Sequence, residues 1–192
     1  MENITIRPHH VLFFDLDDTL VDTNHANFLA YQSAFLLADQ CDFHVTYDPS
    51  IRFNRKIFQQ IFPDMEESVF RKIIQLKEKQ FQSTNTHLNT QMADILRKYS
   101  KTHQTVLVTD CNENRAKAII SHHKLLEYFS DLLFGRPENN TEENKYQYAI
   151  RTLNIPPASI IVFENDEQNI AAAQEIGITQ IINPKKINCY VL

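Results

Sequence analysis

Two aspartates lie two positions apart in the segment Asp15-Leu16-Asp17-Asp18-Thr19, directly after the apolar run from Val11 to Phe14. Such a run is typical of a strand buried on both faces of a parallel sheet, so both carboxylates leave the strand at its carboxyl end. Desolvating both is costly unless a cation or a proton compensates them. Their oxygens suit Mg²⁺, and a carboxylate can also act as a nucleophile. The structural alternative is an ordinary Asx-type turn at the strand end.

The scarcity of glycine limits how this chain can hold a phosphate group. Only Gly135 and Gly177 are present among its 192 residues. This count excludes both the glycine-rich P-loop and the GxGxxG dinucleotide turn. If the chain handles phosphate, side chains and a metal ion must therefore bind it.

Other metal or nucleophile patterns are missing from the sequence. Cys41, Cys111 and Cys189 form no CxxC pair, so neither a disulfide framework nor a zinc site is expected. Cys111 follows Thr109 by two positions but has no histidine partner at a recognisable spacing, so we do not expect a nucleophilic thiol. The eight histidines show no HxxxH or HExxH pattern, and we expect them at the surface or on helix faces.

The composition is that of a soluble globular protein, with 43% hydrophobic and 22% charged residues and a net charge of −5. The acidic balance and the lack of a long basic run argue against a nucleic-acid partner. No segment approaches the roughly 18 apolar residues of a membrane span, and the N-terminus lacks a signal pattern. We expect a cytoplasmic protein without a membrane partner; its oligomeric state stays open.

Strands and helices alternate along the chain and must position the aspartates. The expected strands are residues 11–14, 105–108, 132–134, 160–163 and 179–182, and the helical patterns cover residues 92–99, 116–123, 146–153 and 170–176, the last closed by Gly177. This alternation predicts an α/β fold with a doubly wound parallel sheet, a Rossmann-like core. Such folds place their sites beyond the carboxyl ends of the strands.

One connection is too long for a simple crossover. The interval between Asp15 and Thr109 is about three times the roughly 30 residues of a βαβ unit. Its sequence reads as helical: one helix spans residues 25–40, another is opened by Asp48 and Pro49, and a third is capped by Asp64. We therefore expect residues 22–87 to form a small α-helical cap inserted into a core of residues 1–21 and 88–192.

The ordered motifs resemble those of the haloacid dehalogenase-like (HAD) hydrolases. Asp15-Leu16-Asp17-Asp18-Thr19 is similar to the family's DxDxT signature, Thr109 follows the next core strand, Lys145 precedes the last motif strand, and Glu164-Asn165 follows that strand. The resemblance covers about residues 9–183, with the insertion where the family places its first type of cap. It implies a capped Rossmann-like hydrolase.

The resemblance also implies a role for each motif residue. Asp15 would be the nucleophile that forms an aspartyl-phosphate, and Asp17 the general acid and then base. An aspartate at this second position distinguishes the family's phosphatases and mutases from its dehalogenases. Thr109 would bind a phosphoryl oxygen, and Lys145 would pair with nucleophile and phosphate. The implied cofactor is magnesium, with its ligands among four residues: Asp15, Asp17, Glu164 and Asn165.

The fourth motif departs from the family pattern. Asn165 stands where an aspartate commonly ligates magnesium, so the metal site loses one negative charge and its affinity should weaken. Glu164, or Asp166 by a one-residue shift, would supply the missing carboxylate. Arg136 competes with Lys145 for the third-motif role, since the family sometimes uses arginine there; we prefer Lys145 because its helix leads directly to the last motif strand.

These inferences predict a magnesium-dependent phosphatase that hydrolyses a phosphomonoester. The substrate would be a phosphorylated small metabolite or a phosphorylated protein side chain. A net charge of +3 over residues 49–81 against −8 for the remainder favours anionic substrates, although solvated helix faces explain the same pattern. Two alternatives stay open: a phosphomutase on the same core, and a binding or interaction module on a weakened site.

Overall fold

A computed structural model describes residues 5–40, 42–135 and 143–186 of the chain. The chain divides into two compact units, one of Met1–Val21 with Leu88–Leu192 and the other of Asp22–His87. We call them the α/β unit and the helical unit, and each is described by itself. Arg136, the competing candidate for the third motif, lies outside the described residues.

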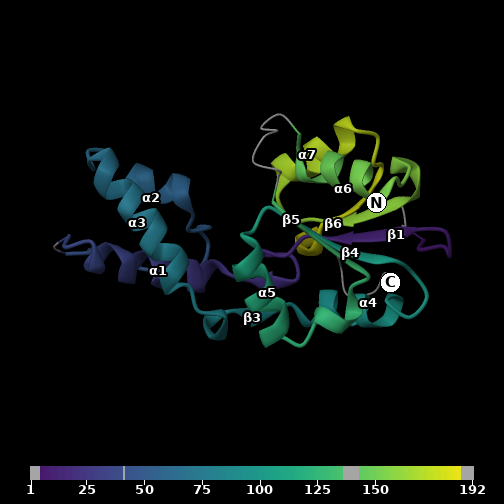
Figure 1. Ribbon diagram of the computed structural model, residues 1–192, viewed down its shortest axis with the longest axis horizontal. Coiled ribbons are helices and arrows are strands. Elements are labelled where there is room, and N and C mark those ends of the chain that lie inside the picture. Colours follow the sequence, from purple (N-terminus) through teal and green to yellow (C-terminus); the bar gives the residue numbers. More distant parts are fainter. Residues whose placement is uncertain (1–4, 41, 136–142, 187–192) are drawn as a thin grey trace. The chain divides into compact units, whose positions relative to one another are not determined.

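The α/β unit is built on a parallel sheet of five strands (Figure 1). The strands are β1 (Val11–Phe14), β4 (Thr105–Thr109), β5 (Asp131–Phe134), β6 (Ile160–Phe163) and β7 (Gln180–Ile182), in the order β5-β4-β1-β6-β7. The central strands β1, β4 and β6 are buried on both faces, which explains their continuous apolar runs. The predicted α/β fold with a doubly wound parallel sheet is confirmed.

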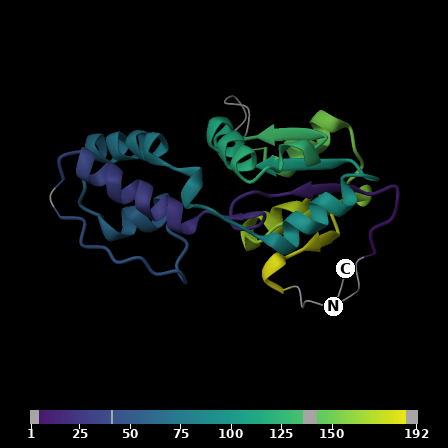
Figure 2. The ribbon, with the colours of Figure 1, turned by 90° about the horizontal axis from the view of Figure 1, so that it is seen from below.

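Helices cover both faces of this sheet. One face carries α4 (Thr90–Tyr99) and α5 (Glu113–His122), and the other carries α6 (Lys145–Leu153) and α7 (Glu167–Glu175). In Figure 2, seen from below, α4 lies in front of the strands. Short 3₁₀ turns complete the unit: η2 (Leu126–Tyr128), η3 (Pro157–Ser159) and η4 (Pro184–Lys186). In the described part of the chain, no helix is long and apolar enough to cross a membrane.

Side-chain caps fix the start of all four helices, and Asn89 caps α4 by accepting from Met92 N at 3.3 Å. Asn112 caps α5, Asn144 caps α6 and Asp166 caps α7, each by accepting hydrogen bonds from two backbone N–H groups of the first turn. The predicted stop at Gly177 is also found: its φ is +90°, and its N–H donates to the Gln174 carbonyl at 2.9 Å just after α7. α5 begins shortly after β4 and α7 shortly after β6, so the first turn of each lies at the carboxyl edge of the sheet.

The helical unit has an aromatic core of its own. Its helices are α1 (Asn24–Leu37), α2 (Arg55–Ile61) and α3 (Glu67–Gln80), followed by the 3₁₀ turn η1 (Ser83–Asn85). Buried rings fill the space between them: Tyr31 stacks on Phe58 at 4.8 Å between ring centroids, and Phe28 meets Phe53 edge-on at 5.2 Å. Where the chain passes between the units, β2 (Val21–Asp22) pairs with β3 (His87–Leu88).

Two predicted helix starts in this unit are wrong. The helix expected from Pro49 begins at Arg55, because Asp48 Oδ1 accepts from Ser50 N in a local turn and Asn54 provides the actual cap. The helix expected after Asp64 begins at Glu67, without a side-chain cap. In both cases the aspartate, a residue type that is common at helix N-caps, lies in a turn instead.

Candidate active site

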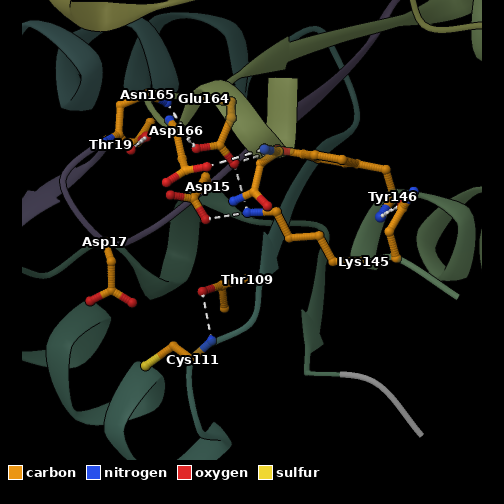
Figure 3. Close-up of polar contacts among 12 residues, drawn as sticks. Asp15, Asp17, Thr19, Thr109, Cys111, Lys145, Tyr146, Glu164, Asn165 and Asp166 are labelled. Atoms are coloured by element: carbon orange, nitrogen blue, oxygen red, sulfur yellow. Dashed lines mark hydrogen bonds and ion pairs between the residues drawn. The ribbon is translucent and has the colours of Figure 1, made fainter. Parts of the chain in front are cut away.

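Neighbouring strand ends bring three of the expected motif residues to one edge of the sheet (Figure 3). Asp15 follows β1, Thr109 ends β4 and Glu164 follows β6; β4 and β6 are the two neighbours of β1. The backbone N–H of Asp15 donates to the Phe163 carbonyl at 3.0 Å, so the first and fourth motifs are held in register. The edge where the site was expected therefore carries these side chains.

A buried lysine links the first and fourth motifs. The Lys145 ammonium, at the first residue of α6, donates to Asp15 Oδ1 at 2.6 Å and to Glu164 Oε2 at 2.7 Å. All three side chains are buried. Two carboxylates share one cation, so the ammonium can offset only one of the two negative charges that the fully ionised pair would carry.

Both carboxylate oxygens of Glu164 are hydrogen-bonded. Oε2 also accepts from the Tyr146 hydroxyl at 2.8 Å, and Oε1 accepts from the backbone N–H groups of Asn165 and Asp166, each at 2.9 Å. Glu164 is thereby fixed against Lys145. The sequence analysis missed Tyr146, because its spacing in α6 marks only a helix residue that faces the core.

Burial and neighbouring charges both shift the pKa values of Asp15 and Lys145. Desolvation raises the pKa of Asp15 to about 7; the Lys145 ammonium opposes the shift, while the Glu164 and Asp17 charges add to it. Burial lowers the pKa of Lys145, but the charges of Asp15 and Glu164 outweigh it and hold that pKa above its ordinary value. Lys145 is therefore a permanent cation beside the candidate nucleophile.

Asp17 is paired with a residue that the sequence analysis did not single out. Arg115 Nη2 lies 3.7 Å from Asp17 Oδ2, and Arg115 Nε donates to Cys111 Sγ at 2.9 Å. The Cys111 backbone N–H in turn donates to Thr109 Oγ1 at 3.1 Å. These contacts connect the loop after β1 with the loop after β4. No sequence motif pointed to Arg115, because Asp17 is far away along the chain and an arginine four positions after a cysteine marks no known site.

Asn165 is buried beside the first motif. Its Oδ1 accepts from the Thr19 hydroxyl at 2.8 Å, and both side chains are buried. Asp166, the shifted candidate, instead caps α7 through Oδ1, which accepts from Gln168 N and Asn169 N. Of the two neighbours, Asn165 is the one that contacts the first motif.

The oxygen donors of the site have the chemistry that Mg²⁺ prefers. Magnesium is usually bound through one or two carboxylates, with waters and substrate phosphate completing its coordination. Asp15 offers a carboxylate oxygen of this kind, Asp17 a carboxyl or backbone carbonyl oxygen, and Asn165 Oδ1, which already accepts from Thr19, keeps a second lone pair. Among the described residues, no three His, Cys, Asp or Glu side chains gather in a way that could hold a metal ion. These oxygen types suit magnesium, and a site here would include the amide of Asn165 beside the aspartates.

Comparison with known proteins identifies the family of the chain. Residues 12–182 match the family of haloacid dehalogenase-like hydrolases. A phosphorylated carbohydrates phosphatase from Thermotoga maritima is 24% identical over 181 residues, which cover 88% of this chain and 82% of that protein.

Solved structures share the fold at low sequence identity. A haloacid dehalogenase-like family hydrolase from Streptococcus pneumoniae superposes with a TM-score of 0.72 at 18% identity, covering 89% of this chain and 82% of that one. CbbY from Rhodobacter sphaeroides, solved with phosphate, gives a TM-score of 0.70 at 17% identity, covering 91% and 86%. These structures support the fold, whereas the family match includes all four motif positions. The chain belongs to the haloacid dehalogenase-like hydrolases.

Proposed function

We propose that this chain is a magnesium-dependent phosphatase that hydrolyses a phosphomonoester through an aspartyl-phosphate on Asp15. The observation that carries the proposal is the buried Lys145 ammonium between Asp15 and Glu164. A fixed cation at this position stabilises the negative charge that gathers when a phosphoryl group meets a carboxylate. It also keeps one oxygen of Asp15 in place while the other faces the substrate.

In the first step, Asp15 Oδ2 attacks phosphorus and the bond to the leaving oxygen breaks. Asp17 donates a proton to that oxygen, so the alcohol leaves neutral. Thr109 Oγ1 accepts a hydrogen bond from Cys111 N and still has its own hydroxyl hydrogen to donate. We assign this hydrogen to a phosphoryl oxygen.

In the second step, Asp17 takes a proton from water, which attacks phosphorus and breaks the bond to Asp15. Inorganic phosphate leaves, and both aspartates return to their starting states. Bound magnesium, held by Asp15, Asn165 and the backbone carbonyl of Asp17, would neutralise phosphoryl charge in both steps, which leaves the Asp17 carboxyl group for the proton transfers. Glu164 then acts as the partner of Lys145, in keeping with the hydrogen bonds on both of its oxygens.

We propose a phosphorylated small molecule, of the phosphorylated carbohydrate class, as the substrate. The similarity to the Thermotoga maritima phosphatase supports this class. The helical unit, Asp22–His87, would act as a cap that excludes bulk water and admits the one molecule that attacks the aspartyl-phosphate. A phosphorylated peptide is the competing substrate, and a substrate panel that contains both classes separates them.

The decisive experiment measures phosphate release from an aryl phosphate with magnesium, for the wild type and for Asp15→Asn. We expect loss of activity in the variant and a hydroxylamine-sensitive phosphoprotein in the wild type only. Equal rates in both proteins would overturn the mechanism. With a sugar phosphate, an isomerised product in place of inorganic phosphate would indicate a phosphomutase. No turnover combined with no magnesium binding would indicate a binding module.

A further inference from the structure

Arg115 joins two loops of the site through its guanidinium group. Nη2 lies 3.7 Å from Asp17 Oδ2, and the two side chains are only 15% and 13% exposed. Such a pair is screened by solvent and salt far less than a surface ion pair. The contact therefore acts directly on the carboxylate to which the proposed function gives both proton transfers.

Arg115 is itself held on two sides. Its backbone N–H lies in the first turn of α5 and donates to the Asn112 cap at 3.4 Å. Its Nε donates to Sγ of the buried Cys111, whose backbone N–H is bonded to Thr109. Because the guanidinium group is planar, fixing Nε also fixes the direction of its two terminal nitrogens. Arg115 is thus a rigid support.

Asp17 needs such a support because of where it lies. It belongs to the loop after β1, where the next residue, Asp18, has a left-handed φ of +62°. Proton transfer requires the carboxylate within about 2.6–3.2 Å of the leaving oxygen and then of water. A displacement of about 1 Å can cost up to about 100-fold in rate. The carboxylate must therefore be held in one orientation.

We propose that Arg115 is a positioning residue that holds the Asp17 carboxylate for its proton transfers, with Cys111 supporting the arginine. This inference rests on the proposed function. It assigns Arg115 to the acid–base side of the reaction. The competing role is direct binding of the phosphoryl group, for which a guanidinium fork is also suited.

A leaving-group comparison tests the proposal. p-Nitrophenyl phosphate needs little help from a general acid, whereas glycerol 2-phosphate, an alkyl ester, needs a proton on its leaving oxygen. For Arg115→Met we expect kcat/KM to fall at least about tenfold for the alkyl ester and less than about threefold for the aryl ester. Arg115→Lys keeps the charge without the fork and should recover part of the loss. Equal losses for both esters, or no loss, would overturn the proposal.

A double-mutant cycle shows whether Arg115 acts through Asp17. In the Asp17→Asn background, Arg115→Met should change kcat/KM for the aryl ester by less than about twofold. Inhibition by inorganic phosphate should keep its inhibition constant within about threefold in Arg115→Met. An additive effect in the cycle, or a much weaker phosphate inhibition, would assign the arginine to phosphoryl binding and overturn the proposal.

A matched variant controls for general damage. Arg97 on α4 forms an ion pair with Asp94 at 3.0 Å, remote from the motifs in sequence. Arg97→Met should leave the aryl-to-alkyl ratio of kcat/KM unchanged, and thermal unfolding checks that both variants are folded. Failure of the proposed function is seen separately, as full activity of Asp15→Asn. A normal Asp15→Asn result with an unchanged ratio in Arg115→Met would overturn only the role of Arg115.

Discussion

The Lys145 ammonium is the charge on which the candidate site depends. It is buried with two carboxylates, Asp15 and Glu164, at 2.6 and 2.7 Å. Removing one partner of a buried ion pair leaves the others desolvated and uncompensated, which is more costly than loss of the attraction alone. The contribution of Lys145 to stability and its contribution to catalysis therefore come from the same contacts.

The variant Lys145→Met should lose both stability and activity. We expect the free energy of unfolding to fall by about 3 kcal/mol, because two buried carboxylates lose their cation. kcat/KM for an aryl phosphate should fall by at least about 100-fold. Urea unfolding and steady-state kinetics provide the two measurements.

An exposed ion pair between a lysine and a glutamate provides the control for this change. Lys117 and Glu113 lie 2.6 Å apart on α5, with side chains 53% and 57% exposed. Lys117→Met should change stability by less than about 0.5 kcal/mol. If Lys145→Met were as mild, the buried cluster would not have the energetic weight that its geometry implies.

The side-chain amide of Asn165 is the basis of the second prediction. Asn165→Asp adds a negative charge to the proposed oxygen donors, and Mg²⁺ affinity rises with ligand charge. Calorimetric titration should show Mg²⁺ binding tightened by about tenfold, equivalent to about 1.4 kcal/mol. Asp166→Asn is the control and should leave the affinity within about twofold, since Asp166 caps α7. An unchanged affinity in Asn165→Asp would place the metal on other donors.

At the scale of elements, the N-terminus of α6 determines where Lys145 lies. Asn144 accepts from Tyr146 N and Gln147 N, both at 2.9 Å, and Gln147 Oε1 accepts from Asn144 N in return. This capping box fixes the first turn, which begins at Lys145. The direction of the ammonium therefore depends on a cap whose own side chain is polar and partly exposed.

Asn144→Ala tests this dependence. Loss of the cap should lower the free energy of unfolding by about 1 kcal/mol. It should also lower kcat by a larger factor than it changes KM, because the first turn frays next to Asp15. Gln147→Ala removes only the return bond and should have the smaller effect on both. Equal activity in Asn144→Ala and the wild type would show that the Lys145 ion pairs alone hold the turn.

The strands were predictable because buried parallel strands have a simple signature. Continuous apolar runs at β1, β4 and β6 follow from burial on both faces, and acidic or hydroxyl residues directly after them mark the carboxyl edge. The gathering of Asp15, Lys145 and Glu164 follows from this topology. Their chemical roles stay predictions.

Other features have no local signature. Asp48 and Asn54 are both residue types that are common at helix N-caps. The sequence analysis favoured Asp48, which forms a local turn, whereas Asn54 is the cap of the helix. Arg115 and Tyr146 acquire their importance from partners far along the chain, Asp17 and Glu164. Pairings of this kind depend on the folded topology and are invisible to spacing arguments.

At the scale of the molecule, each unit has its own core, and the motif residues belong to one of them. Asp15, Asp17, Thr109, Lys145 and Glu164 all lie in the α/β unit. The helical unit is held instead by packed aromatic rings such as Tyr31 and Phe58. Stability of the α/β unit is therefore the property that bears directly on the site.

One histidine of the α/β unit differs from its expected position. The sequence analysis placed all histidines at the surface or on helix faces, but His10 is buried directly before β1. Its Nδ1 accepts from Arg7 N at 3.0 Å, and its Nε2 lies 3.3 Å from the Gln180 side chain on β7. An imidazole that accepts a backbone hydrogen bond at Nδ1 must be unprotonated there, so the folded state selects neutral His10.

The stability of the α/β unit should therefore depend on pH through His10. Burial, and then the nearby His9, Arg7 and His103, lower the pKa of His10 below its ordinary value of 6.5. The unfolded chain then binds more protons, so this stabilisation is complete above 6.5 and is lost as pH falls toward the lowered pKa. Urea unfolding at about pH 7.5 and about pH 5.5 should show a smaller loss in His10→Gln than in the wild type. His122→Gln should behave like the wild type, and an identical pH dependence in all three proteins would contradict the assignment.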